Sequence, residues 1–205
     1  MYIPAHFRKD DPDHLLTFIR EHSFGVLVTQ EQGAPFASHL PFLLDTAKGA
    51  YGALRAHMAR ANPHWQHFKA GQEALVIFQG PHAYISPSWY ENHPSVPTWN
   101  YTAVHAYGIP RLLDAEELPA ALRDSVAAYE TPLPKPWSME SLTEEYIEKM
   151  TRAIVGFEIQ ILRLEGKFKL SQNRPEADRM GVIEALQQSG DPHRIAVAEV
   201  MRSED

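Results

Sequence analysis

Three cations, a hydroxyl group and two carboxamides lie close together between Gly166 and Pro175. Lysine, arginine, serine and carboxamide side chains can all donate hydrogen bonds to a phosphate or another small anion. Serine and asparagine also commonly close turns, and lysine and arginine commonly lie in water, so ordinary turn capping explains the same residues somewhat better. From this segment alone, an anion site and a capped turn both remain open.

The residues on either side place this run at the end of a strand. Phe157, Ile159 and Ile161 alternate with Glu158 and Gln160, which is the period of a strand with one buried face. Apolar residues at helical spacing follow Pro175. A turn into a helix N-terminus offers unpaired N–H groups and the positive end of the helix dipole, which would add to the attraction for an anion.

A second group of candidate residues lies around the loop from Pro87 to Tyr101. Its large rings, Trp89, Tyr90, Trp99 and Tyr101, could enclose a flat ligand, although closing a core is their commoner use. Hydroxyl, carboxamide and cationic groups elsewhere could then meet ring heteroatoms and a phosphate. The candidates for such a site are Thr98, Asn100, Gln79, Arg60, Lys169, Ser171, Gln172, His39 and His57. Together they suit a planar, phosphorylated heterocycle, while solvated cations and capped turns are the simpler explanation of each alone.

Several other chemistries lack the residues they need. The chain has no cysteine, which excludes disulfides, thiolate nucleophiles, iron–sulfur clusters and thiolate zinc sites. There are 11 histidines, but His64 and His67 have no third ligand at a suitable spacing, so we expect no metal site. Neither a Gly-x-Ser-x-Gly elbow, nor a Walker loop, nor Gly-x-Gly-x-x-Gly occurs. We therefore name no catalytic residue. If the protein has a cofactor, we expect an organic one.

Length and charge narrow the class of protein further. A chain of 205 residues can bury a substantial core as one domain. With 26 acidic against 19 Lys and Arg residues, broad attachment to nucleic acid or anionic lipid is disfavoured. The basic run between Arg163 and Arg179 is interrupted by Glu165, Glu176 and Asp178, and no helix-turn-helix is evident, so direct DNA binding is only weakly supported. Without a signal peptide or a membrane-spanning segment, a soluble cytoplasmic protein is expected.

The predicted elements favour a mainly β fold with peripheral helices. Strands are expected at 24–29, 35–44, 50–54, 74–78, 82–86, 101–113 and from 157, and helices from 12, 62, 115, 141, 175 and 191. Pro41 cannot donate to a ladder, so its strand should be an edge or carry a bulge. Hairpin connections predict a closed antiparallel barrel of the α+β class. We expect a single domain over 1–205, with a helical insertion at about 114–150 and C-terminal helices.

Six ordered motifs spread along the chain resemble one known family. They are Met1 to Phe7, Ala37 to Phe42, His57 to Trp65, Tyr84 to Tyr90, Val96 to Tyr101 and Gly166 to Arg174. The whole chain is similar to the PaiB family, described as FMN-binding negative transcriptional regulators. The resemblance implies an FMN-binding split barrel, usually a homodimer with flavin near the subunit interface.

The resemblance also implies roles for individual residues. Arg60, Lys169, Ser171 and Gln172 would be phosphate partners, with His57 on the phosphate side. Thr98, Trp99 and Asn100 would line the flavin pocket.

Three functions remain open at this point. The first is a flavin-responsive regulator that influences transcription directly or through a DNA or protein partner. The second is an FMN-dependent oxidoreductase acting on a small molecule. The third is a haem-binding or haem-degrading protein, because histidine-rich split barrels are similar to haem-degrading ones. The absorption spectrum of the purified protein would distinguish flavin from haem.

Overall fold

A computed structural model of the chain describes residues 1–204, apart from the side chains of residues 69 and 70. Within this range one sheet contains eight strands: β1 (Arg8–Lys9), β2 (Phe24–Glu31), β3 (Ala34–Pro41), β4 (Leu43–Asp45), β5 (Ala53–Ala59), β6 (Ala74–Ile85), β7 (Thr98–Leu112) and β8 (Ile154–Lys169). The strand order is β3-β2-β6-β7-β8-β5-β4, and β1 pairs with β8. The mainly antiparallel sheet with peripheral helices is confirmed. The closed barrel is wrong, because in the described residues the order ends at β3 and β4 without joining them.

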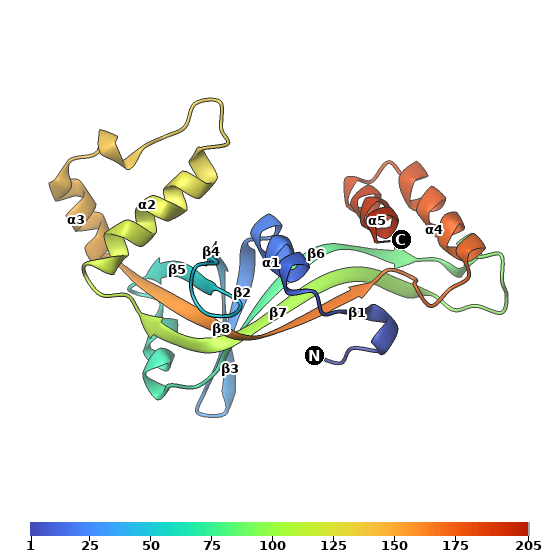
Figure 1. The fold of residues 1–205 in the computed structure, drawn as a ribbon, viewed down its shortest axis with the longest axis horizontal. Helices are drawn as coiled ribbons and strands as arrows, with labels where there is room; N and C mark the ends of the chain where they lie inside the picture. The colour runs from blue at the N-terminus through green and yellow to red at the C-terminus, as the bar shows by residue number, and fades with distance from the viewer. Residues whose placement is uncertain (205) are drawn as a thin grey trace. The chain divides into compact units, whose positions relative to one another are not determined.

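The helices are α1 (Pro12–Glu21), α2 (Glu117–Glu130), α3 (Glu144–Arg152), α4 (Glu176–Gln188) and α5 (Pro192–Ser203) (Figure 1). Short 3-10 segments are η1 (Ala5–Phe7), η2 (Pro63–Ala70), η3 (Pro87–Trp89) and η4 (Met139–Ser141). None of the helices within residues 1–204 is long and apolar enough to span a membrane.

The chain divides into two compact units. The first unit contains Met1–Asp11, Gln79–His105 and Glu165–Asp205, and the second contains Pro12–Phe78 and Ala106–Leu164. Strands β6, β7 and β8 each contribute a segment to both units. The assignment of 1–205 to a single domain stays a prediction.

The second unit is built on the β2–β3 hairpin. Its two-residue turn is formed by Gln32 and Gly33, both at positive φ (51° and 84°), which is the backbone that a tight hairpin with twisted strands requires. Pro41 is the last residue of β3, and β3 ends the strand order, so the edge position expected for this proline is confirmed. The fully buried core of this unit includes Ile19, Leu27, Phe42, Leu54, Phe78, Phe157 and Ile159.

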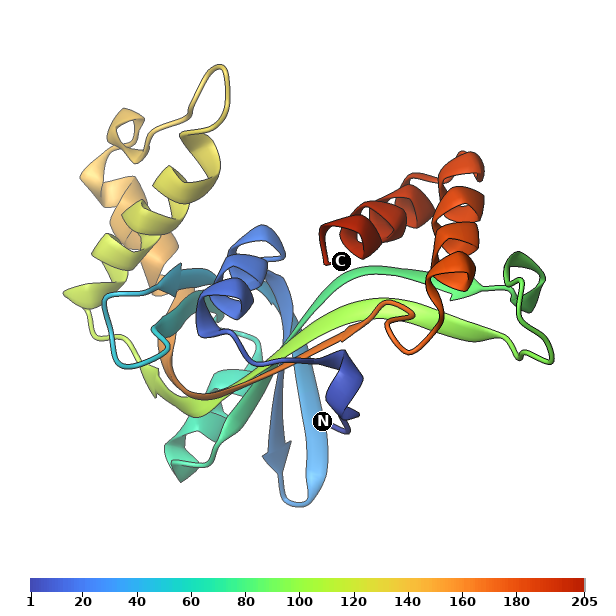
Figure 2. The same ribbon diagram turned by 45° about the vertical axis from the view of Figure 1, so that its right-hand side comes forward.

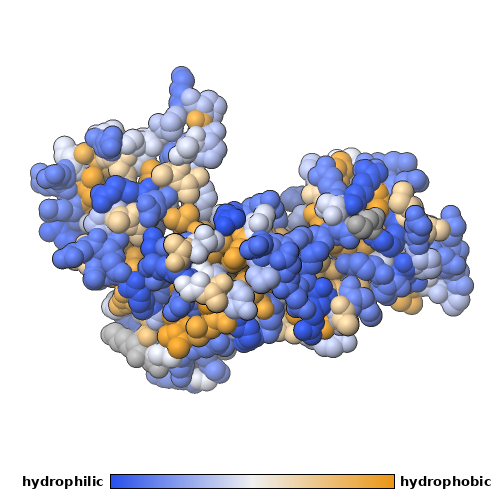
Figure 3. Space-filling model, viewed as in Figure 1, coloured by the Kyte–Doolittle hydropathy of each residue, from blue (hydrophilic) through white to orange (hydrophobic). Residues whose placement is uncertain are grey.

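The helical insertion belongs to the second unit. Helix α2 approaches β8 where Gly156 leaves room: a Cβ at that position would lie only 2.5 Å from Leu118. Helix α3 begins at a cap in which the Thr143 side chain accepts a hydrogen bond from Tyr146 N. Neither helix contains a fully buried residue, and apolar side chains show among the hydrophilic ones over this insertion (Figure 3). The large exposed ones are Tyr129, Leu133, Trp137, Tyr146 and Met150.

The first unit combines the outer parts of β6, β7 and β8 with β1, α4 and α5. Helices α4 and α5 lie next to each other in both views (Figures 1 and 2). Helix α5 begins with Pro192 behind a capping Asp191, whose side chain accepts from His193 N. Gly181 of α4 comes so near to η3 that a Cβ there would lie 2.3 Å from the Trp89 carbonyl oxygen.

Three strand predictions are wrong in detail. The strand predicted at 35–44 is divided in two, because β3 ends at Pro41 and β4 begins at Leu43. Strand β6 runs without interruption from Ala74 to Ile85, although Gly80 and Pro81 suggested a hairpin between two short strands. Both residues are accommodated inside the long strand. The strand predicted at 50–54 begins only at Ala53, because Gly52 has φ +79° and ends a turn.

Candidate functional site

An open pocket lies in the first unit. Its walls come from η1, the segment around η3, the start of β7 and the turn that follows β8. The lining residues are Phe7, Tyr90, Val96, Pro97, Thr98, Lys169, Ser171, Asn173 and Arg174. Two cations and no carboxylate line this pocket, so its chemistry suits an anion that also carries apolar or aromatic surface.

Lys169 is the half-buried cation of the pocket. Its Nζ donates to Thr98 Oγ1 at 2.6 Å and to the Trp99 carbonyl oxygen at 2.7 Å. Burial, and then the positive charges of Lys167 and Arg174, lower the pKa of Lys169 below its ordinary value. The charged form of the ammonium group is therefore disfavoured here, because none of these contacts is a carboxylate. A bound anion would stabilise the charged form.

Arg174 and Tyr90 form the second polar feature of the pocket. The guanidinium carbon of Arg174 lies 4.4 Å from the centre of the Tyr90 ring, and NH1 donates to Ser95 Oγ at 3.2 Å. Tyr90 is only 4% exposed, and its hydroxyl group has no hydrogen-bond partner within the described residues. A buried hydroxyl without a partner is costly, so a ligand atom that hydrogen-bonds it would be favoured.

The turn beneath the pocket is held by side-chain hydrogen bonds. Ser171 has φ +67°, a left-handed conformation that is unfavourable for a serine. Buried Asn100 donates from Nδ2 to Ser171 Oγ at 3.0 Å. Gln172 accepts from Leu170 N at 2.8 Å and donates to the Phe168 carbonyl oxygen at 2.7 Å. In this structure Asn100 and Gln172 shape the turn, while Ser171 also faces the pocket.

The N-terminus of α4 already has acidic partners from its own first turn. Glu176 and Asp178 lie there, and buried Asp178 accepts hydrogen bonds from Glu91 N at 2.9 Å and Asn92 N at 3.0 Å. Although burial opposes it, a hydrogen bond from the Asn92 side chain and these two backbone hydrogen bonds lower the pKa of Asp178. The attraction for an external anion therefore comes from the cations of the pocket rather than from this helix end.

Two further sequence candidates lie in the first unit but do not line the pocket. Trp99 is 53% exposed, with its ring centre 6.0 Å from that of Tyr84. Gln79 is exposed, and its Nε2 lies 3.3 Å from His82 Nδ1. The pocket thus contains Thr98, Lys169 and Ser171 from the predicted set.

The remaining candidates belong to the second unit. Exposed Arg60 donates from Nε to the Arg152 carbonyl oxygen and from NH2 to the Ile154 carbonyl oxygen, both at 2.8 Å. His39 is exposed, with its ring 6.4 Å from that of Phe24.

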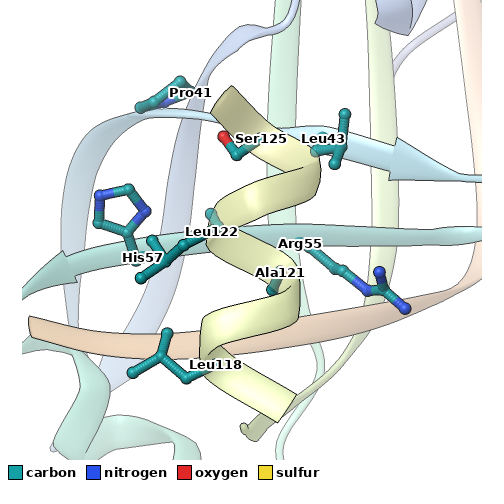
Figure 4. Close-up of a pocket in the computed structure, with 9 residues that line it drawn as sticks. Pro41, Leu43, Arg55, His57, Leu118, Ala121, Leu122 and Ser125 are labelled. Atoms are coloured by element: carbon teal, nitrogen blue, oxygen red, sulfur yellow. The ribbon is translucent and has the colours of Figure 1, made fainter. Parts of the chain in front are cut away.

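His57 is half-buried in the second unit, and burial lowers its pKa. It projects from β5 beside α2, and Figure 4 shows His57 and Arg55 on opposite sides of that helix. The pocket there is lined by Pro41, Leu43, Arg55, Ala56, His57, Leu118, Ala121, Leu122 and Ser125.

The list of candidate residues omitted Phe7, Asn173 and Arg174, and Tyr90 was named only as one of the rings of the loop. Arg174 and Asn173 stand in the same polar run as Lys169, and Tyr90 is among the loop rings, so the signals were present. Phe7 carried no such signal, because its closeness to Lys169, 5.6 Å from Nζ to the ring centre, depends on how η1 folds. Within residues 1–204, no group of three or more His, Asp or Glu side chains could hold a metal ion.

Comparison with known proteins decides the family. Residues 1–163 match the sequence model of a family described as "Putative FMN-binding domain". This chain belongs to that family. It is also 42% identical, over 98% of its length and 96% of the relative's, to "Protease synthase and sporulation protein PAI 2" of Bacillus subtilis. The PaiB resemblance is therefore confirmed, and FMN is the cofactor that the family's description names.

Solved structures support the split-barrel fold of this FMN-binding family. A FAD and heme binding protein from Mycobacterium smegmatis superposes with a TM-score of 0.62 at 12% identity, covering 84% of this chain and 78% of that one. The flavocytochrome Anf3 from Azotobacter vinelandii superposes with a TM-score of 0.60 at 13% identity, covering 87% of this chain and 78% of that one. At such low identity the likeness shows the fold alone.

Proposed function

We propose that the protein binds FMN noncovalently, with the phosphate in the pocket of the first unit. The observation that carries this proposal is that Lys169 and Arg174 both line a pocket that no carboxylate lines. A phosphate is the anion that such cations bind well, and the family's description names a phosphorylated flavin. When bound, FMN supplies a ring system that can accept and return electrons.

Each part of the pocket then has a role that its chemistry allows. Lys169 and Arg174 neutralise the phosphate, and the hydroxyl groups of Ser171 and Thr98 are available to it. The Tyr90 hydroxyl, which is buried without a partner in the described residues, would gain a ligand acceptor. Apolar surface for the flavin comes from Phe7, Val96 and Pro97. The family match ends at residue 163, so Tyr90 and Thr98 lie within it, whereas Lys169 and Arg174 follow it.

We further propose that FMN binding serves regulation, as the PaiB resemblance implies. The name of the Bacillus relative, a protease synthase and sporulation protein, describes a physiological programme rather than a chemical reaction. The homodimer and the cytoplasmic location stay predictions that light scattering and fractionation would test. A regulatory partner, whether DNA or protein, is part of the same proposal.

The experiment begins with the absorption spectrum of protein purified without added cofactor, followed by titration with FMN. We expect a flavin spectrum or saturable quenching of FMN fluorescence. Lys169→Met and Arg174→Met should each weaken FMN binding by about 1 to 3 kcal/mol, the scale of a lost hydrogen bond to a charged group. Lys149→Met, an exposed lysine of α3, is the matched control and should bind as the wild type does.

Three results would count against this assignment. A Soret band would indicate haem instead of flavin. A colourless protein that ignores added FMN would remove the cofactor altogether. Normal binding by Lys169→Met and Arg174→Met, with lost binding by Arg60→Met, would move the phosphate to the second unit.

A further inference from the structure

One face of the sheet in the first unit carries exposed rings. His82 and Tyr84 on β6 and Trp99 and Tyr101 on β7 form this surface, which we name the aromatic face. The Trp99 ring centre lies 6.0 Å from that of Tyr84 and 6.4 Å from that of His82. Tyr84 is 42% exposed and Trp99 is 53% exposed. Exposed rings that gather on one face, unlike single exposed rings, often mark an interaction surface.

The opposite face of the same strands is covered by the C-terminal helices. Asn100 and Thr102, which alternate with Trp99 and Tyr101 along β7, are 0% and 1% exposed. Asn100 Nδ2 lies 3.4 Å from Met201 Sδ of α5. Since one face already packs on helices, the rings of the aromatic face are not needed to complete the core of this unit.

Cations border the aromatic face. Lys167 Nζ lies 5.3 Å from the centre of the Tyr101 ring and 5.5 Å from that of Tyr2. It donates to the Tyr2 carbonyl oxygen at 3.1 Å rather than to a carboxylate. Exposed Arg8 is the register partner of Lys167 across the β1–β8 ladder, which places both residues on the same side of the sheet.

Two of the three acidic residues that interrupt this basic run in the sequence are ion-paired or buried in the fold. Glu165 is paired with the amino group of Met1. Asp178 is fully buried and accepts backbone N–H groups. Glu176 is exposed, in the first turn of α4. Glu165 and Asp178 therefore offset the cations beside the aromatic face less than their positions in the sequence suggest, although the whole chain has a net charge of −7.

We propose that the aromatic face binds single-stranded nucleic acid, with bases stacked on Trp99, Tyr84 and Tyr101 and phosphates near Lys167 and Arg8. Rings on a sheet surface with cations at its border are the combination that single strands require, because every base has a flat face and every nucleotide a charge. The proposal does not depend on flavin binding.

Fluorescence anisotropy with labelled oligonucleotides tests the proposed single-strand binding. Probes of about twelve nucleotides are suitable, because single-strand sites span about 4 to 16 nucleotides. Oligo-U, oligo-dT and a duplex of equal length serve as three probes, and the first two separate RNA from single-stranded DNA. Single strands should bind more tightly than the duplex, with affinity falling as salt rises. Trp99→Ala and Tyr84→Ala should each weaken single-strand binding by roughly 5- to 100-fold. Lys167→Gln should weaken it and reduce the magnitude of the logarithmic salt slope by about 0.7.

Trp137→Ala is the matched control, because Trp137 is 46% exposed but lies in the helical insertion. It should bind oligonucleotides as the wild type does, and all variants should retain the wild-type circular dichroism spectrum. Absence of single-strand binding by the wild type at low salt would overturn the proposal. Unchanged oligonucleotide binding by Trp99→Ala and Lys167→Gln would also overturn the proposal. A Trp99→Ala variant that loses self-association while the wild type ignores oligonucleotides would instead make this face a contact between two copies.

Discussion

Lys169 is held in a position that is unfavourable for a cation when no anion is bound. Burial lowers its pKa first, and Lys167 and Arg174 lower it further, so the folded protein disfavours the charged form. The resulting loss of stability is present below the lowered pKa and disappears as the pH rises towards the ordinary lysine value. Residues that favour a ligand at the expense of stability are frequent in binding sites.

We therefore predict that Lys169→Met weakens FMN binding while leaving the FMN-free protein as stable as the wild type, or more stable. The methionine keeps the apolar stem that packs near Phe7 and removes the desolvated charge. Thermal unfolding with and without FMN measures both effects on one sample. A variant that loses stability and FMN affinity together would show that Lys169 is a structural residue.

His64 is the centre of a buried hydrogen-bond chain in the second unit. Its Nδ1 lies 2.8 Å from Ser38 Oγ and its Nε2 lies 2.8 Å from Thr29 Oγ1, which is also 2.8 Å from His67 Nδ1. Burial, and then the neighbouring His67, lower the pKa of His64 from 6.5 to about 4. The neutral ring is therefore the form that this chain of hydrogen bonds contains.

From this we predict an acid-sensitive component of stability. The folded protein keeps His64 neutral, whereas the unfolded chain takes up a proton below about pH 6.5. Stability is thus fully present above that pH and is lost as the pH falls towards 4, by up to about 3 kcal/mol. Urea unfolding of the wild type and of His64→Gln over this range measures the difference between their pH slopes. Equal slopes would mean that His64 does not titrate as proposed.

Helix α2 is fastened to the sheet by a network of charges around Glu158. This carboxylate is 5% exposed and accepts from Lys48 Nζ at 2.6 Å, Arg55 Nε at 3.0 Å and Arg111 NH2 at 2.9 Å. Arg111 also forms two hydrogen bonds of 2.8 Å with Glu117 of α2. Glu158 on β8 therefore organises the cations that the helix uses to attach.

Glu158→Gln should destabilise the protein by about 2 to 4 kcal/mol, because three cations would lose the carboxylate that they surround. Glu117→Gln, at the exposed end of the same network, should have a much smaller effect, since exposed ion pairs contribute little. Denaturant unfolding of both variants measures the difference. If the two substitutions cost the same, the network would not be centred on Glu158.

Among the elements, those with strong local signals were predicted well from the sequence. Asn62 and Gly71 cap η2, Asp191 caps α5, and Pro41 ends an edge strand, as their residue types indicate. The long strand β6 was not predicted as one element, because Gly80 and Pro81 break local patterns that pairing with neighbouring strands overrides. Whether a sheet closes depends on pairing between distant strands, which periodicity does not encode.

The candidate site was predicted in part for the same reason. Thr98, Lys169 and Ser171 share a pocket because the start of β7 lies beside the end of β8. The aromatic loop and the basic run in the sequence suggested these residues. Asn100 and Gln172 have the right residue types, but their side chains hold the turn. Arg60 and His57 also have suitable residue types, but they lie in the other unit.

At the scale of the whole molecule, local charge and net charge differ in sign. The chain has a net charge of −7, yet the pocket of the first unit is lined by two cations and no carboxylate. In the proposed site a phosphorylated flavin would be held by close contacts with these cations, because the overall field does not attract an anion. We therefore predict that the phosphate is the part of FMN on which binding depends most.

The most direct test compares FMN with riboflavin, which has the same ring system but no phosphate. Titration of the wild type should give at least about tenfold tighter binding of FMN, equivalent to about 1.4 kcal/mol. In the Lys169→Met, Arg174→Met double variant the two flavins should bind with nearly equal, weak affinity. Equal binding of both flavins by the wild type, or a preference for FMN that survives the double substitution, would contradict the assignment of the phosphate to this pocket.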